Sequence, residues 1–432
     1  MKNFIIPALF YCLSQVASAA PDPGLGACYS PDGPLSEEQL LGRSRSECET
    51  APGATTQTYL RCFFRVDDDA RRPATSYAWA READGEYYRV EGYWWSASPL
   101  QWRNMFYSDA TQEALAETCR STLEHAGIDR PLAMFAAANN ALSFNHTIWS
   151  NDVPTPAGAI NKLIAFGDSL SDTQNMYNAS LWRLPNSQSW YLGRFSNEQV
   201  WTEYLARHLG LPLYNWAVGG AAGDTAHLVV PGLLQQVRSW RQYMQEASGY
   251  RAEHTLFTVW IGGNDLLTYG RSVDQVSANV TQALAEMVDA GARHILLLNL
   301  PDVSRAPVFK YRGDATRIAA QVRDYNARLA ALVQRLRSRH TDLNLQLYDA
   351  YALFNDVFAN PARYQFANVT DSCLEINRSS SLDYMLRQRT RASCRDPHTF
   401  LFWDTLHPTT QTHRLLAERL GQQVKAMLPG LR

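Results

Sequence analysis

A serine, an aspartate and a histidine occupy positions from which they could together carry out nucleophilic catalysis. Ser169 lies in Phe166-Gly-Asp-Ser-Leu-Ser-Asp172, directly after a short apolar run that is typical of a buried strand. Asp404 and His407 lie in Phe402-Trp-Asp-Thr-Leu-His-Pro408, ahead of the last helical period. A serine nucleophile needs a base to take its proton, and the base needs a carboxylate to hold its tautomer. Each segment alone could equally be a turn that caps a helix.

Two glycine-rich segments could supply the donors that acyl transfer requires. Val218-Gly-Gly-Ala-Ala-Gly223 and Ile261-Gly-Gly-Asn-Asp265 each follow a predicted strand. The tetrahedral intermediate of acyl transfer carries an oxyanion that preorganised N–H groups must meet. We expect the backbone N–H groups of Ser169 and Gly220 and the side-chain amide of Asn264 to form this oxyanion hole. The chemistry requires no metal and no organic cofactor.

Strands and helices alternate after residue 160, and this alternation must position the candidate residues. Apolar strand patterns occupy 162–166, 212–216, 255–261, 294–300 and 346–350. Helical periods occupy 198–209, 228–245, 273–290, 315–339 and 410–427. Such alternation predicts an α/β fold with a parallel sheet covered on both faces. Ligands in these sheets bind beyond the carboxyl ends of the strands, where the candidate residues fall.

The region before this alternation is predicted to be a separate small α+β domain. Residues 58–66 and 86–95 form aromatic, strand-like runs, and 111–126 reads as a helix. Ser108 and Asp109 are its candidate N-caps, and Gly127 is its stop signal. The Pro- and Gly-containing stretch 151–159 reads as a linker. The expected domains are therefore 21–150, an accessory domain, and 160–432, a catalytic domain.

Residues 1–20 have the pattern of a secretory signal peptide. Lys2 precedes an apolar run, and small residues at 16–20 follow as a cleavage site. The alternative is a membrane anchor, but the run is too short to cross a bilayer about 30 Å thick. Because secreted chains fold in oxidising compartments, the cysteines after residue 20 are disulfide candidates: Cys28, Cys48, Cys62, Cys119, Cys373 and Cys394. Pairing is expected within the four early and the two late cysteines. The alternative of a zinc site is disfavoured because no Cys-x-x-Cys pair is present.

The composition disfavours two broad classes of protein. The chain has 432 residues, 46% of them hydrophobic, and a formal net charge of −2. Enough apolar side chains are present to fill a core, so extended disorder is not expected. The basic footprint of a nucleic-acid-binding protein is missing, so nucleic acid is not an expected partner.

The four candidate blocks in the order Ser, Gly, Asn and Asp-x-x-His resemble the SGNH (GDSL) hydrolases. The resemblance implies a three-layer α/β/α sandwich with a flavodoxin-like sheet and assigns Ser169 as nucleophile, with His407 and Asp404 as its partners. Further segments resemble the secreted thermolabile haemolysins of Vibrio, among them Tyr214-Asn-Trp-Ala-Val-Gly-Gly-Ala-Ala-Gly223 and Cys373-Leu-Glu-Ile-Asn-Arg-Ser-Ser-Ser381. Those proteins are phospholipases A and lysophospholipases, related to bacterial glycerophospholipid–cholesterol acyltransferases.

This resemblance implies an enzyme secreted by a Gram-negative bacterium that acts on phospholipid or lysophospholipid at membrane surfaces. Whether cholesterol is a further acyl acceptor stays open. One departure is Gln174, which stands where the family usually has Gly. If that position requires a positive φ, the glutamine backbone is strained there.

Several alternatives stay open at this stage. Five aromatic residues between the first two blocks could form an acyl channel and lipid rim, or simply core: Trp182, Trp190, Tyr191, Phe195 and Trp201. The segment 373–394 is a candidate lid or processing site. A small-acyl or carbohydrate esterase is the rival enzyme, and a host-surface binding module is the rival role for residues 21–150.

Overall fold

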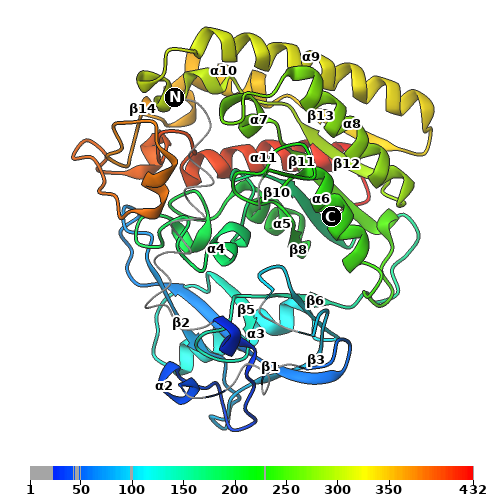
Figure 1. The fold of residues 1–432 in the computed structure, drawn as a ribbon, viewed down its shortest axis with the longest axis vertical. Coiled ribbons are helices and arrows are strands. Elements are labelled where there is room, and N and C mark those ends of the chain that lie inside the picture. Colours follow the sequence, from blue (N-terminus) through cyan, green and yellow to red (C-terminus); the bar gives the residue numbers. More distant parts are fainter. Residues whose placement is uncertain are drawn as a thin grey trace.

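The computed structural model describes residues 23–41, 43, 48, 50–97, 101–227 and 230–431. The predicted signal peptide lies outside these residues. Two bodies of secondary structure lie one beneath the other, and the chain passes from the first to the second at residues 151–161 (Figure 1). No helix within the described ranges combines the length and apolar character needed to cross a membrane.

The first body is an antiparallel-rich sheet with one helix against it. Its strands run in the order β2-β1-β3-β4-β6, and β5 also pairs with β1. Its elements are η2 (Pro23–Ala27), α2 (Glu37–Leu40), β1 (Thr55–Arg65), β2 (Thr75–Trp79), β3 (Arg89–Trp94), β4 (Met105–Ser108), α3 (Gln112–His125), β5 (Met134–Ala138) and β6 (Thr147–Ser150). The Cys62–Cys119 disulfide ties β1 to α3, and Cys28–Cys48 closes the N-terminal segment. Both pairings stay within the early group of cysteines.

The N-terminus of α3 corrects one prediction. Thr111, not Ser108 or Asp109, is the N-cap, because its hydroxyl accepts the N–H of Ala114 at 3.1 Å. Ser108 instead donates to the carbonyl of Glu91 at 2.7 Å and belongs to β4. The helix ends before Gly127, whose φ of +67° allows the chain to reverse there.

The second body is the predicted three-layer α/β/α fold, which the structure confirms. Its five-stranded sheet runs in the order β13-β12-β11-β7-β8, and every pairing is parallel. The strands are β7 (Lys162–Gly167), β8 (Leu213–Asn215), β11 (Thr255–Trp260), β12 (His294–Leu298) and β13 (Asn344–Tyr348). β7 leads to β8 on one side, and the chain then crosses to β11 on the other. The carboxyl end of β7 is thus a topological switch point, where such sheets bind ligands.

Helices cover both faces of this sheet. On one face α6 (Leu233–Tyr243) packs on α8 (Val273–Asp289), which packs on α9 (Ala315–Arg339). On the other face α5 (Trp201–Leu209) packs on α11 (Thr410–Met427). The remaining elements are α4 (Asn175–Ala179), β9 (Ala226–His227), β10 (Val230–Pro231), α7 (Gly263–Leu267), α10 (Ala350–Ala359), β14 (Asn368–Ser372) and β15 (Phe400–Phe402), with short 3-10 turns between them.

The two bodies share a continuous core. Tyr107 and Trp149 of the first body belong to the same buried cluster as Tyr214 and Tyr243 of the second. The ring centroids of Trp149 and Tyr214 are 3.8 Å apart, and the hydroxyl of Tyr107 donates to the carbonyl of Tyr243 at 2.8 Å. Large buried aromatic contacts of this kind hold the two bodies in a fixed orientation.

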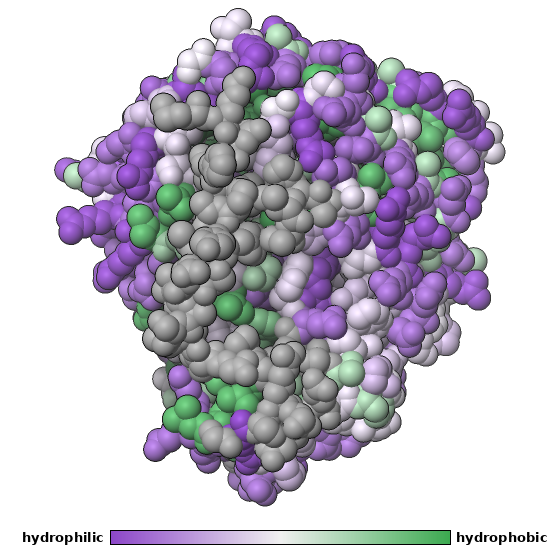
Figure 2. Space-filling view, viewed as in Figure 1, coloured by the Kyte–Doolittle hydropathy of each residue, from purple (hydrophilic) through white to green (hydrophobic). Residues whose placement is uncertain are grey.

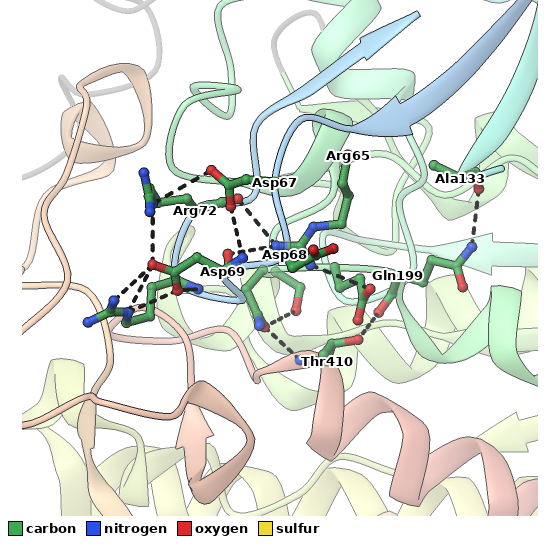
Figure 3. Close-up of polar contacts among 12 residues, drawn as sticks. Arg65, Asp67, Asp68, Asp69, Arg72, Ala133, Gln199 and Thr410 are labelled. Carbon is green, nitrogen blue, oxygen red and sulfur yellow. Dashed lines mark hydrogen bonds and ion pairs between the residues drawn. The ribbon is translucent and has the colours of Figure 1, made fainter. Parts of the chain in front are cut away.

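A polar chain also connects the first body to the start of α11 (Figure 3). The amide of Gln199 donates to the carbonyl of Ala133 at 3.3 Å, and the hydroxyl of Thr410 donates to the carbonyl of Gln199 at 3.0 Å. Beside this chain, Arg65 on β1 forms an ion pair of 3.5 Å with Glu198. The first body therefore contacts the segment that supports the turn bearing His407.

Candidate active site

Ser169 lies two residues beyond the carboxyl end of β7. Gly167 ends the strand without a side chain, because a Cβ there would stand 2.7 Å from the carbonyl oxygen of Trp260 on the adjacent strand. The carbonyl of Asp168 accepts the N–H groups of Ser171 and Asp172, each at 3.0 Å, and so closes a tight turn. This turn leaves Ser169 8% exposed, at the wall of a cavity.

His407 and Asp404 share one turn between β15 and α11. The Oδ1 atom of Asp404 accepts the N–H groups of Leu406 and His407 at 2.9 Å each. The Nδ1 atom of His407 lies 2.9 Å from Oδ2 of Asp404, and Nε2 lies 2.7 Å from Oγ of Ser169. A buried carboxylate, an imidazole and a hydroxyl thus form one hydrogen-bonded chain. Such a chain can move a proton from the hydroxyl to the imidazole.

Electrostatics favour the ionised form of Asp404. Burial by itself would raise the pKa of this carboxyl, since the side chain is fully shielded from solvent. The imidazole of His407 and the backbone N–H donors outweigh that effect and hold the pKa below its usual value. The carboxylate is therefore available to orient the imidazole and to stabilise its protonated form.

Two aromatic residues that sequence reasoning did not connect with the triad contact Asp404. The indole Nε1 of Trp190 donates to Oδ2 of Asp404 at 2.9 Å. The ring of Tyr384 packs edge-on against His407 with centroids 5.3 Å apart, and its hydroxyl lies 3.5 Å from Oδ1 of Asp404. Trp190 and Tyr384 stand 214 and 20 residues before Asp404 in the chain, so no local pattern predicts either contact.

The two glycine-rich segments contact each other, and the second of them shares a cavity wall with Ser169. Asn264 lines the same cavity as Ser169 and His407, and its amide Nδ2 donates to the carbonyl of Ala221 at 3.0 Å. Gly220 has a φ of +82°, and its carbonyl accepts the hydroxyl of Tyr269 at 2.6 Å. A positive φ suits glycine, and the absence of a side chain leaves its N–H unshielded.

A further residue, Asp172, ties the first two blocks together. Its carboxylate accepts the N–H of Gly219 at 2.7 Å and three N–H groups at the start of α4, those of residues 174, 175 and 176. Asp172 is fully buried. The sequence shows Asp172 in the same motif as Ser169, but it does not show that Asp172 holds the start of α4 and the N–H of Gly219. Gln174 beside it has a φ of +136°, as expected from the glycine that the family has there.

Two buried carboxyl groups flank the site without joining the triad. Burial raises the pKa of Asp168 to about 7 and the pKa of Asp265 to about 6. Asp265 accepts the N–H of Gly223 at 3.0 Å, so it fixes the end of the glycine-rich segment. Asp168 accepts the N–H of Leu170 at 3.0 Å. Near neutral pH the site therefore carries less negative charge than its carboxyl groups suggest.

An apolar cavity opens beside Ser169 and His407. The cavity and the open solvent at its mouth together amount to about 680 Å³. Its apolar wall comes from the segment after β12, from α10 and from the turn around β15, namely Leu300, Val303, Ala306, Phe354, Phe358 and Phe402. An apolar cavity that begins at a nucleophile can hold a hydrocarbon chain.

Of the two alternatives for the aromatic residues between the first two blocks, the structure favours core over an acyl channel. Among the described residues that line the cavity, none of the five is present. Trp190, Tyr191, Phe195 and Trp201 are at most 5% exposed, and Trp182 is half-buried. They are core: Trp201 donates to Oγ of Ser171 at 3.1 Å, and the ring of Phe195 packs against His407.

The late cysteines form the third disulfide, Cys373–Cys394. The segment that they close packs on the residues after α4: Asn186 donates its N–H to the carbonyl of Tyr384 at 2.8 Å. Gln388 donates its N–H to the hydroxyl of Ser189 at 2.8 Å. The segment is therefore hydrogen-bonded against the part of the chain that holds Trp190.

Comparison with known proteins gives matches over both bodies. Residues 163–420 match the family described as GDSL-like Lipase/Acylhydrolase. Residues 29–151 match the family described as Vibrio dual lipase/transferase, N-terminal domain.

Relatives also match over most of their own length. The thermolabile hemolysin of Vibrio parahaemolyticus is 43% identical over 381 residues, which cover 87% of this chain and 90% of that protein. The phosphatidylcholine-sterol acyltransferase of Aeromonas hydrophila is 28% identical over 308 residues, covering 60% of this chain and 89% of that protein. A solved structure of a lipolytic G-D-S-L protein from Veillonella parvula aligns with a TM-score of 0.35 and 16% identity, covering 60% of this chain and 96% of that chain.

Proposed function

The chain belongs to the family of GDSL-like lipases and acylhydrolases, and we propose that within it the protein is a phospholipase A and lysophospholipase. That it is an esterase or acyltransferase follows from the family. The single observation that carries the finer proposal is the apolar cavity that opens at the hydroxyl of Ser169. Such a cavity suits a fatty-acyl chain and favours it over the acetyl group of a carbohydrate ester.

In this proposal Ser169 is the nucleophile. Its Oγ attacks the ester carbonyl carbon while Nε2 of His407, 2.7 Å away, accepts its proton. Asp404 holds Nδ1 and stabilises the imidazolium, and the N–H groups of Ser169 and Gly220 and the amide of Asn264 bind the oxyanion. The carbonyl reforms as the glyceryl oxygen leaves with the proton of His407. Water, deprotonated by His407, then attacks the acyl carbon, and His407 returns the proton to Oγ of Ser169 as the fatty acid leaves.

Acyl transfer to a sterol is a second candidate activity. Two findings favour it: the name of the family matched by residues 29–151 includes a transferase, and a sterol acyltransferase is among the relatives. In chemical terms the change is small, because a sterol hydroxyl replaces water as the acceptor of the acyl group on Ser169.

We also propose that the protein is secreted, with residues 160–432 as the catalytic domain and 21–150 as an accessory domain. Three disulfides support folding in an oxidising compartment. The shared core between the two bodies supports an accessory domain that stabilises the catalytic one. If residues 21–150 also bound a receptor, they would need a surface that is not buried against the catalytic domain. The relation to a hemolysin makes lysis of red cells an activity to be tested.

The test is product analysis by mass spectrometry on vesicles of phosphatidylcholine and cholesterol. The wild-type protein is expected to release fatty acid and lysolipid, and Ser169→Ala is expected to release neither. Cholesteryl ester among the products would establish the transferase activity. Cleavage of a short nitrophenyl ester without any action on vesicles would overturn the phospholipase proposal and leave a small-acyl esterase.

A further inference from the structure

One turn of the disulfide-closed segment 373–394 exposes apolar side chains and buries a charged one. In η9 (Ser381–Met385) and the residue after it, Leu382 is 46% exposed and Leu386 is 51% exposed. Asp383, between them, is only 4% exposed, and its carboxylate pairs with the guanidinium of Arg378. The two leucines stay in contact with water, although apolar side chains are stabilised by leaving it. The outer side of the turn therefore presents apolar side chains that a surface less polar than water would cover.

Positive charge outnumbers negative charge in the residues around this turn. Residues 373–395 contain five arginines and two carboxylates. Arg387 and Arg389 are exposed, and within the described part of the chain no carboxylate is paired with either guanidinium. Figure 1 shows this segment beside β14. At the same place in Figure 2, strongly hydrophilic side chains project next to hydrophobic ones. Arginine beside exposed leucine matches the chemistry of a lipid surface, in which phosphates lie above hydrocarbon.

This turn lies directly over the catalytic residues. Tyr384, between the two leucines, turns inward, where its ring packs against His407, Phe195 and Trp190. Burial raises the pKa of its hydroxyl well above the usual range, so the inward side chain stays neutral. A surface that binds the outer side of the turn is therefore brought close to the imidazole.

We propose that Leu382, Leu386, Arg387 and Arg389 form a docking surface for a bilayer that contains anionic phospholipid. The leucines enter the boundary between headgroups and acyl chains, and the guanidinium groups pair with phosphates. The proposal rests on the proposed function in that the bilayer is the source of the substrate. The inward contacts of Tyr384 then hold the triad beside the membrane surface.

The test measures binding rather than turnover, with every variant made on Ser169→Ala so that the lipid is not consumed. Co-sedimentation uses vesicles of phosphatidylcholine alone and of phosphatidylcholine with phosphatidylglycerol. The L382S/L386S pair is expected to lower the partition coefficient about tenfold on both vesicles. The R387Q/R389Q pair is expected to lower it about 30-fold on the anionic vesicles at low salt and to leave binding to neutral vesicles unchanged. High salt should remove the arginine effect.

Matched controls change the same residue types elsewhere. Leu41, which is 71% exposed after α2, becomes serine, and Arg335 and Arg337 near the end of α9 become glutamine. These controls are expected to bind as the parent does, and thermal unfolding verifies that every variant is folded.

Three results would overturn the proposal. One is unchanged binding in both docking-surface variants, and another is equal loss in the arginine control, which would make net charge the cause. The third is a change of mass in light scattering with the loop variants alone, which would make a second copy of the chain the occupant. Because binding is measured on inactive protein, a failure of the phospholipase proposal would leave this result standing.

Discussion

Replacing Trp190 with phenylalanine should separate the hydrogen bond that Trp190 donates to Asp404, the proposed catalytic carboxylate, from the packing around it. The change removes the indole N–H that lies 2.9 Å from Oδ2 of Asp404. The contacts of the carboxylate with Leu406 and His407 remain. One hydrogen bond to a buried charged group is worth about 1.5–3 kcal/mol. If most of this is felt in the transition state, kcat/KM falls about 10- to 100-fold.

The control is Trp403→Phe, which makes the same substitution in the same buried cluster. Trp403 is fully buried, and its Nε1 donates at 2.9 Å to the backbone carbonyl of Ser189 rather than to Asp404. Both variants should lose similar thermal stability, because each leaves a cavity of similar size. Only the Trp190 variant should lose most of its activity.

The pH profile provides a readout that packing alone would not change. The indole of Trp190 donates to the carboxylate of Asp404, and a hydrogen bond to the charged form lowers the pKa of a carboxyl, so removal of this donor should raise the pKa of Asp404. The acidic limb of kcat/KM should therefore move to higher pH in Trp190→Phe and stay in place in Trp403→Phe. Assays on a soluble nitrophenyl ester from pH 4 to pH 9 measure both quantities. Equal activity loss and identical acidic limbs in the two variants would refute the reasoning.

Other predictions test the surroundings of the triad. Asn264→Ala should lower kcat about 10²- to 10³-fold with little change in KM, and wild-type turnover would exclude its amide from the oxyanion hole. Burial raises the pKa of Asp168 to about 7, so the folded protein holds a proton that the unfolded chain releases near pH 4. Wild-type stability should therefore fall relative to Asp168→Asn between about pH 4 and pH 7, by a total of about 2–4 kcal/mol, and a pH-independent difference in thermal unfolding would contradict this. Replacing Cys62 and Cys119 with serine should lower the free energy of unfolding by about 4 kcal/mol, because the disulfide joins residues 57 apart in the chain. Denaturant titration measures this free energy, and a loss below about 1 kcal/mol would count against the entropic account. Ala306→Phe should fill the cavity and lower the ratio of dodecanoate to butyrate ester hydrolysis about tenfold or more, whereas an unchanged ratio would place the acyl chain elsewhere.

The parallel sheet could be predicted from the sequence because each of its strands is a short apolar run followed by a helical period. Boundaries were less predictable. The predicted strand 346–350 ends at Tyr348, because Asp349 accepts the N–H of Ala352 and starts α10. That cap is a local signal that was missed. The strands β4 and β6 have four residues each, too few for an alternating pattern to stand out.

The candidate site likewise contains residues that could be predicted from the sequence and features that could not. Ser169, His407 and Asp404 were predictable because each stands at the end of an element and carries its chemistry in its own residue type. The cavity was not, since its wall combines α10 with segments near residues 300 and 402. Trp190 could not be connected with Asp404 because 214 residues separate them. An aromatic side chain in a sequence carries no sign of which buried carboxylate its N–H will reach.

The most direct test of the central claim is to trap the acyl-enzyme during turnover of phosphatidylcholine. Wild-type protein is quenched with acid while the vesicles are being consumed, and its peptides are then analysed by mass spectrometry. The account predicts a fatty-acyl adduct on the peptide that contains Ser169 and none in Ser169→Ala. Release of lysolipid with the adduct on another residue, or continued release by Ser169→Ala, would contradict it.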